Sequence, residues 1–152
     1  MRALFPAGVY SAFSGASNEP LPLVEQEARS VTHAVPARQR EFALGRSCAR
    51  AALTQFGAVA TAIPVGEDRS SVWPVGFVSS ITHCAAFVGA VVARTDQIEA
   101  TRFDVKPAVP IDADLVSLVR TEAEIRWTQG APPPPAADWG KVFFAAKEAV
   151  QK

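Results

Sequence analysis

The chain has 152 residues, 49% hydrophobic and 20% charged, which is the composition of a globular domain and not of a disordered tail. Lys and Arg together number 15, as do Asp and Glu, so the zero net charge argues against long-range attraction to nucleic acid or an anionic membrane. Two cysteines make neither a disulfide framework nor a zinc site, and no apolar run is long enough to span a bilayer. We therefore expect a cytoplasmic protein whose anion sites are local.

The N-terminal third predicts a strand, a small helix and one long helix. Gly, Ser, Asn and Pro interrupt residues 1–35, which indicates a short strand, a loop and a small helix near residues 25–30. Residues 37–56 are the clearest helix, with Pro36 near its start and Gly57 just past its end. Its apolar stripe consists of Phe42, Ala49, Leu53 and Phe56. Three arginines, Arg38, Arg46 and Arg50, lie off this stripe.

The middle of the chain predicts strands. Residues 58–78 indicate loops and a short strand, because Pro and Gly recur in them. Residues 78–82 predict a strand, His83 and Cys84 a tight turn, and residues 87–93 a buried strand. A further strand is expected over residues 98–105, ending at Asp104.

The C-terminal part predicts two helices around a linker. Asp112 is expected to cap a helix over residues 112–127. Four consecutive prolines within residues 131–137 predict a stiff, extended linker. An amphipathic helix begins near Lys141 and is still running at Lys152, which indicates a chain that is cut short.

Four clusters are candidates for chemistry, and each has a simple structural alternative. The arginines of the long helix suit phosphate, although such a set is more typical of a solvated helix face. Residues 66–69 and 73–76 suit a phosphate and a base ring, or form an ordinary surface loop. His83 with its hydroxyl neighbours suits an anion, or is a satisfied, partly buried residue. Asp104 and Glu148 suit Mg²⁺, whereas Glu148 and Lys152 alone make an ordinary helical ion pair.

The order of these clusters carries a resemblance to a known family. The helix segment Arg40-Glu41-Phe42-Ala43-Leu44-Gly45-Arg46-Ser47-Cys48-Ala49-Arg50 is followed by Trp73-Pro74-Val75-Gly76 and by Ser80-Ile81-Thr82-His83-Cys84. A segment ending in an Asp and the run Phe144-Ala145-Ala146-Lys147-Glu148 come next. In this order the motifs resemble those of phosphopantetheinyl transferases of the siderophore-synthase type, over residues 36–152.

The resemblance implies an activity and its site residues. The reaction would move 4′-phosphopantetheine from coenzyme A to a serine of an acyl or peptidyl carrier protein, with Mg²⁺. Arg38, Arg46 and Arg69 would hold the phosphates of coenzyme A, with Lys147 nearby. Ser80 and His83 would contact its nucleotide end, His83 through the 3′-phosphate.

The resemblance also implies a metal site and catalytic residues. Asp104 and Glu148 would bind Mg²⁺ beside the pyrophosphate, and Glu148 would help to deprotonate the carrier serine, directly or through a water. Lys152 would stabilise the charge on the leaving side. The family pattern is like Asp-x-Glu, whereas this chain has Asp104-Val105-Lys106. Lys106 either repels Mg²⁺ or pairs with the carboxylates and substitutes for part of the metal's charge.

The expected fold is α+β, with an antiparallel sheet packed on the long helix. The resemblance implies two similar halves, the first complete and the second partial: residues 1–130, a Pro-rich linker 131–138, and residues 139–152 with the catalytic helix. Such a chain is a fragment, a degraded relative, or one whose partner supplies the rest. Two other functions stay open. One is a non-catalytic module that binds coenzyme A or a nucleotide, and the other is an interaction domain that docks through Phe143 and Phe144.

Overall fold

The structure is a computed structural model that describes residues 5–59, 62–132, 134 and 138–151. Its contacts divide the chain into two compact units, residues 1–103 and 104–152. The Pro-rich linker predicted over residues 131–138 falls partly on residues 133 and 135–137, outside the described residues.

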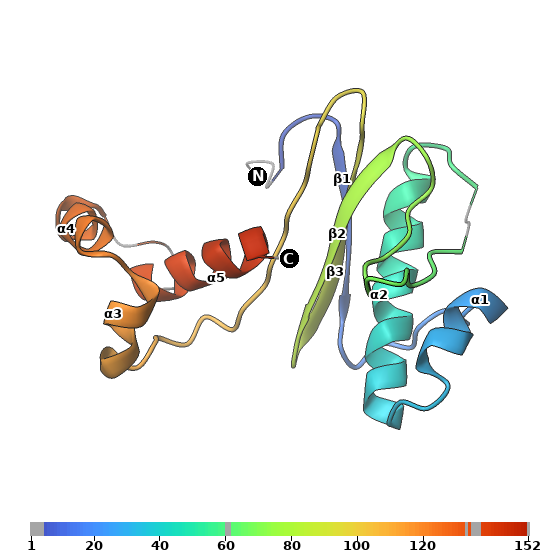
Figure 1. Ribbon diagram of the computed structural model, residues 1–152, viewed down its shortest axis with the longest axis horizontal. Helices are drawn as coiled ribbons and strands as arrows, with labels where there is room; N and C mark the ends of the chain where they lie inside the picture. The colour runs from blue at the N-terminus through green and yellow to red at the C-terminus, as the bar shows by residue number, and fades with distance from the viewer. Residues whose placement is uncertain (1–4, 60–61, 133, 135–137, 152) are drawn as a thin grey trace. The chain divides into compact units, whose positions relative to one another are not determined.

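The first unit is built on a three-stranded antiparallel sheet in the order β1-β3-β2 (Figure 1). The strands are β1 (Val9–Gly15), β2 (Phe77–Cys84) and β3 (Phe87–Arg94). The central strand β3 pairs with β2 along its whole length and with β1 over residues 87–93. Six consecutive residues of β3 are buried, so both of its faces are covered. The strands predicted at residues 78–82 and 87–93 are confirmed within one or two residues.

Two sequence predictions in this unit are wrong. His83 and Cys84 are not in the turn, because they pair with Val88 and Phe87 as the last residues of β2, and the turn lies at residues 85–86. Residues 98–105, all of them described, form no strand. The sheet ends at β1 and β2, and this stretch of alternating apolar and polar residues adds no strand to either edge; Figure 1 draws it as a plain trace.

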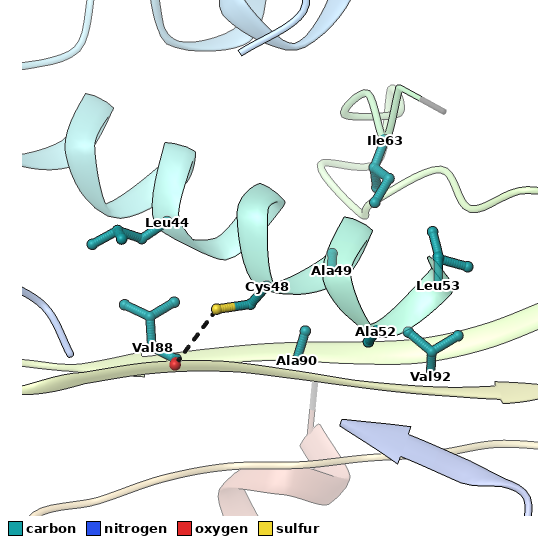
Figure 2. Packing of buried hydrophobic residues seen from close by; sticks show 9 residues of the cluster. All are labelled: Leu44, Cys48, Ala49, Ala52, Leu53, Ile63, Val88, Ala90 and Val92. Atoms are coloured by element: carbon teal, nitrogen blue, oxygen red, sulfur yellow. Dashed lines mark hydrogen bonds between the residues drawn. The ribbon is translucent and has the colours of Figure 1, made fainter. Parts of the chain in front are cut away.

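Helix α2 (Pro36–Thr54) covers one face of the sheet (Figure 1). Residues four apart on α2 share one face, and alternate residues of β3 meet them, because these are the periods of a helix and a strand. Figure 2 shows the resulting core, which Ile63 completes from a loop. Its buried members are Leu44, Cys48, Ala49, Ala52, Leu53, Ile63, Val88, Ala90 and Val92. Burial raises the pKa of the Cys48 thiol, as expected for a thiol that packs as an apolar group.

Two of the three arginines singled out on α2 are not part of a solvated face, whereas the Arg38 side chain is half exposed. Arg46 is 4% exposed and Arg50 is 6% exposed. Arg50 pairs at 2.5 Å with Glu27, a fully buried residue of the short helix α1 (Glu25–Ala28). Helix α1 continues into the 3₁₀ turn η1 (Arg29–Val31), so the small helix predicted near residues 25–30 is confirmed.

The second unit is helical. It contains the 3₁₀ turn η2 (Ala113–Leu115), α3 (Val116–Val119), α4 (Glu122–Gly130) and α5 (Trp139–Gln151). The single helix predicted over residues 112–127 is wrong, because it breaks at Arg120 and Thr121. Thr121 has extended backbone dihedral angles and caps a new helix, with its side chain accepting from the Glu124 amide. Helix α5 begins two residues before the expected start.

Candidate functional site

The first unit contains a cavity of about 430 Å³ between α2, the end of β2 and the loop before it. Four of the predicted coenzyme A contacts line this cavity: Arg38 and Arg46 from α2, Arg69 from the loop, and His83 from β2. Residues 38 and 46 lie about two helical turns apart, so both point to the same side of α2. Helical spacing thus accounts for Arg38 and Arg46, while only the fold brings Arg69 and His83 to the same cavity.

Arg46 is the most unusual group of the cavity wall. Burial, the largest influence, lowers its pKa to about 10, while Glu27 opposes that change. Its guanidinium carbon lies 4.3 Å from the centre of the Phe42 ring, and its Nε has no hydrogen-bond partner among the described residues. A guanidinium on a cavity wall is suited to an anion that enters the cavity, although the Nε atom itself is shielded from solvent.

Arg69 reaches the cavity from a tight turn. It has φ of 66°, a left-handed conformation that costs energy for any residue with a side chain. The turn is closed by the Arg69 amide donating to Gly66 and the Gly66 amide donating to Ser70. Asp68 accepts from the Ser70 hydroxyl and amide, and these hydrogen bonds lower the pKa of Asp68. The turn thus holds a strained arginine at the cavity wall.

Glu41 is a cavity residue that the sequence analysis did not single out. Its carboxylate pairs with Arg38 at 3.1 Å and with the Nε2 atom of His83. The spacing of three residues between Arg38 and Glu41 was a signal for the first contact. The pair with His83 depends on the sheet being packed against α2, so the helical spacing did not predict it.

Ser80 lies on the other face of the sheet from this cavity. His83 and Ile81 line the cavity, and side chains alternate along β2, so Ser80 points away from α2. Its hydroxyl donates to the Phe103 carbonyl at 3.2 Å. The structure therefore separates Ser80 from the four residues with which it was grouped.

The second unit brings the two predicted metal ligands together around a lysine. Lys106 Nζ lies 3.1 Å from Asp104 Oδ2 and 3.6 Å from Glu148 Oε2. The Asp104 side chain is 2% exposed, that of Lys106 25% and that of Glu148 40%. Lys106 Nζ also lies 5.3 Å from the centre of the Phe144 ring, one helical turn before Glu148 on α5.

These residues do not fit Mg²⁺ as they are placed. Mg²⁺ needs oxygen ligands in octahedral geometry at about 2.0–2.1 Å, and an ammonium offers hydrogen-bond donors but no lone pair. Among the described residues, no group of three or more His, Cys, Asp and Glu side chains is arranged to hold a metal ion. The two carboxylates instead share an internal cation.

Of the two remaining lysines of the predicted site, Lys147 and Lys152, only Lys147 lies within the described residues. Lys147 Nζ donates to the Val119 carbonyl at 2.7 Å and to Glu124 at 2.8 Å. The hydrogen bond from Lys147 is the main cause that lowers the pKa of Glu124. Lys147 thus ties α5 to α3 and α4. Lys152 lies outside the described residues, so its predicted role stays a prediction.

The cavity of this α+β unit is lined by arginines and a histidine, side chains whose donors suit a phosphorylated ligand. Comparison with known proteins identifies the family. Residues 26–93 match the family model of the 4′-phosphopantetheinyl transferase N-terminal domain. The 4′-phosphopantetheinyl transferase Svp of Streptomyces mobaraensis is 37% identical over 154 residues, which cover 99% of this chain and 63% of that protein. The 4′-phosphopantetheinyl transferase PptT of Mycobacterium tuberculosis is 38% identical, over 88% of this chain and 57% of that protein.

A third relative settles the family. The 4′-phosphopantetheinyl transferase Npt of Nocardia iowensis is 31% identical over the whole of this chain and 68% of that protein. The chain belongs to the 4′-phosphopantetheinyl transferase family. It spans less than two thirds of the length of the Svp and PptT proteins that it matches.

In the part of the chain that the structure describes, no helix is both long enough and apolar enough to cross a bilayer.

Proposed function

We propose that the protein acts in the transfer of 4′-phosphopantetheine from coenzyme A to a serine of an acyl or peptidyl carrier protein. The observation that carries the proposal is the cavity lined by Arg38, Arg46, Arg69 and His83. The three relatives, each named a 4′-phosphopantetheinyl transferase, support it. The motif order further supports the siderophore-synthase type and, with it, a cytoplasmic setting.

The cavity would hold the phosphates of coenzyme A. Arg38 and Arg69 provide planar, permanently charged donors at its rim, and Arg46 provides one inside. His83 would take the 3′-phosphate. Glu41 pairs with both Arg38 and His83, so an entering phosphate would compete with this carboxylate for them. Ser80, on the opposite face, would contact the ligand only after a rearrangement of β2.

The transfer itself would rely on positioning and charge. The carrier serine oxygen forms a bond to the phosphorus of the pantetheine phosphate, and the bridging P–O bond to the nucleotide phosphate breaks. Glu148 would accept the serine proton, directly or through a water. Lys152 would stabilise the negative charge on the leaving nucleotide phosphate. Asp104 would hold Lys106 in place through their ion pair.

The resemblance also predicts that Mg²⁺ takes part, held by Asp104 and Glu148. The arrangement of these carboxylates around Lys106 argues against a ready-made metal site. The transfer step is therefore assigned to side chains of the protein alone. Lys147, predicted near the phosphates, would first have to leave Glu124.

A mass measurement tests the proposal. The chain is mixed with apo carrier protein, coenzyme A and Mg²⁺, and the carrier is weighed, with a full-length relative alongside. We expect the carrier to gain one phosphopantetheine. No gain in mass, while the relative modifies the same carrier, would overturn the transfer activity of this chain.

A second candidate is binding of coenzyme A without transfer, which the pairing of Lys106 with the two carboxylates favours. Calorimetry with coenzyme A separates the two functions. Binding that is unaffected by Mg²⁺, together with no transfer, supports the second candidate. Absence of binding removes both. Arg69→Gly tests one cavity cation without straining the fold, because glycine adopts the left-handed backbone conformation of residue 69 at no steric cost. A weakened affinity for coenzyme A without a loss of stability would assign Arg69 to the ligand.

A further inference from the structure

Lys106 lies where a cation that bridges Asp104 and Glu148 would lie. Its ammonium is 3.1 Å from one carboxylate and 3.6 Å from the other, and both distances are those of ion pairs. The two acidic residues come from different elements, the segment at the start of the second unit and α5. Two carboxylates held this close repel each other unless a positive charge lies between them.

The burial of Asp104 separates this arrangement from an ordinary surface ion pair. Its side chain is 2% exposed, and a carboxylate withdrawn from water to this extent needs a charged partner. Lys106 is itself largely withdrawn from solvent, with the Phe144 ring near its ammonium. The lysine is therefore part of the site and not a mobile surface chain.

The charge balance works against a metal ion. Two carboxylates and one ammonium leave a single negative charge, so a divalent cation is attracted by one net charge and repelled by an ammonium at its own position. It would also have to displace Lys106 and leave that ammonium without its partners. An ammonium cannot ligate Mg²⁺, so Lys106 removes a ligand position as well as part of the attraction.

We propose that Lys106 is a built-in cation of this site: it fills the position between Asp104 and Glu148, and the pair does not take up a divalent metal ion. Where the proposed transfer takes place, Lys106 supplies the positive charge beside the carboxylates. Only that last clause rests on the proposed function. The occupancy of the site rests on the geometry of the second unit alone.

The test measures binding of Mn²⁺ to the purified chain by electron paramagnetic resonance, without coenzyme A or carrier protein. The wild-type chain is expected to show no saturable binding at millimolar Mn²⁺. Lys106→Glu replaces the ammonium with a third carboxylate and is expected to bind Mn²⁺ at least about tenfold more tightly. Bound metal should also raise the thermal midpoint of this variant, and not that of the wild type.

Three variants make the result specific. Lys106→Arg keeps the charge and should stay without metal. Lys106→Glu combined with Asp104→Asn should lose the gained binding, which locates the ion at this pair. Lys106→Gln removes the charge and offers only a neutral carbonyl oxygen, so it should show a smaller gain. It serves in place of Lys106→Glu if circular dichroism shows that the latter is unfolded.

Two outcomes would overturn the inference. One is wild-type binding of Mn²⁺ as tight as that of Lys106→Glu and abolished by Asp104→Asn. The other is a folded Lys106→Glu or Lys106→Gln chain with no gain at all. Neither depends on transfer activity, so an inactive chain still decides the question. An active chain that binds Mn²⁺ tightly would keep the proposed function and remove this inference.

Discussion

The arginines of α2 show how much one residue's surroundings decide. Arg50 and Arg46 are four residues apart on one helix and both are buried, yet their environments differ. Arg50 donates to Glu27 and to the Pro22 carbonyl, whereas Arg46 lines a cavity and has an unused Nε. We therefore expect Arg50 to stabilise the fold and, under the proposed function, Arg46 to contact the ligand, and each expectation makes a prediction.

Replacement of Arg50 by Met should be strongly destabilising. Glu27 is fully buried, and it also accepts from the Ile63 amide at 2.9 Å, so loss of Arg50 leaves a buried charge without its cation. We expect a loss of about 3–5 kcal/mol in the free energy of unfolding, measured by urea titration. The double variant Glu27→Gln with Arg50→Met should recover part of this loss. An Arg50→Met chain as stable as the wild type would contradict the assignment.

Replacement of Arg46 by Met should have the opposite effect on the unliganded chain. Burial lowers the pKa of Arg46 to about 10, so folding disfavours its charged form. This cost is present below that pKa and is relieved as the pH rises through it, since the unfolded chain then holds the proton more tightly. At pH 7 we expect Arg46→Met to gain about 1–2 kcal/mol, because solvent screening leaves less than the full shift.

Two measurements check the Arg46 prediction. The stability advantage of Arg46→Met over the wild type should shrink as the pH is raised toward about 10.5. Its affinity for coenzyme A should fall by about tenfold or more, because a charge-assisted hydrogen bond is lost. Arg29→Met is the matched control, because Arg29 is an exposed arginine with an i, i+4 partner and does not line the cavity. Equal effects of both variants on affinity would contradict the assignment.

At the scale of elements, local capping overrides a helical pattern. The apolar spacing over residues 112–127 is continuous, but Thr121 and Glu124 form a capping box that starts α4 afresh. Arg120 accordingly has extended backbone angles, which interrupt the ladder between α3 and α4. The break leaves α3 short enough for its Val119 carbonyl to accept from Lys147.

Thr121→Ala should loosen the start of α4. The change removes the side-chain oxygen that accepts from the Glu124 amide and should cost about 1 kcal/mol. Amide hydrogen exchange is the measurement, and the Glu124 amide should lose the most protection. Ser117→Ala, at an exposed position of α3, is the control and should leave α4 unchanged. Unaltered exchange at Glu124 in the Thr121 variant would show that the cap contributes nothing.

At the scale of the whole molecule, coenzyme A should stabilise the folded chain, because under the proposed function it binds the folded state. A ligand at one hundred times its dissociation constant adds about 2.7 kcal/mol to the free energy of unfolding, so the thermal midpoint should rise. Dephospho-coenzyme A lacks the 3′-phosphate assigned to His83 and should raise the midpoint less at equal concentration. In His83→Ala this difference between the two ligands should disappear. A difference that persists in His83→Ala would place the 3′-phosphate elsewhere.

The sequence predicted an element correctly where the residues that specify the element lie within its own length. Helix α2 was predicted because proline, glycine and a repeating apolar stripe lie within its own length. The turn was predicted at His83 and Cys84 but lies at residues 85–86, because the register of a hairpin depends on pairing between strands. The strand expected at residues 98–105 failed for a related reason, since its apolar residues specify burial but not a pairing partner.

The sequence by itself determined the helices α1 and α2, the strands β2 and β3 to within one or two residues, the ordered motifs and, through them, the family resemblance. Tertiary structure decided which charged groups share a site. Glu27 and Arg50 are 23 residues apart in the chain, and Lys106 meets Glu148 from another element. An ion pair depends on distance in space and on the loss of water around it, and neither follows from spacing along the chain. The arginines that resembled a solvated face are for this reason a buried support and a cavity wall.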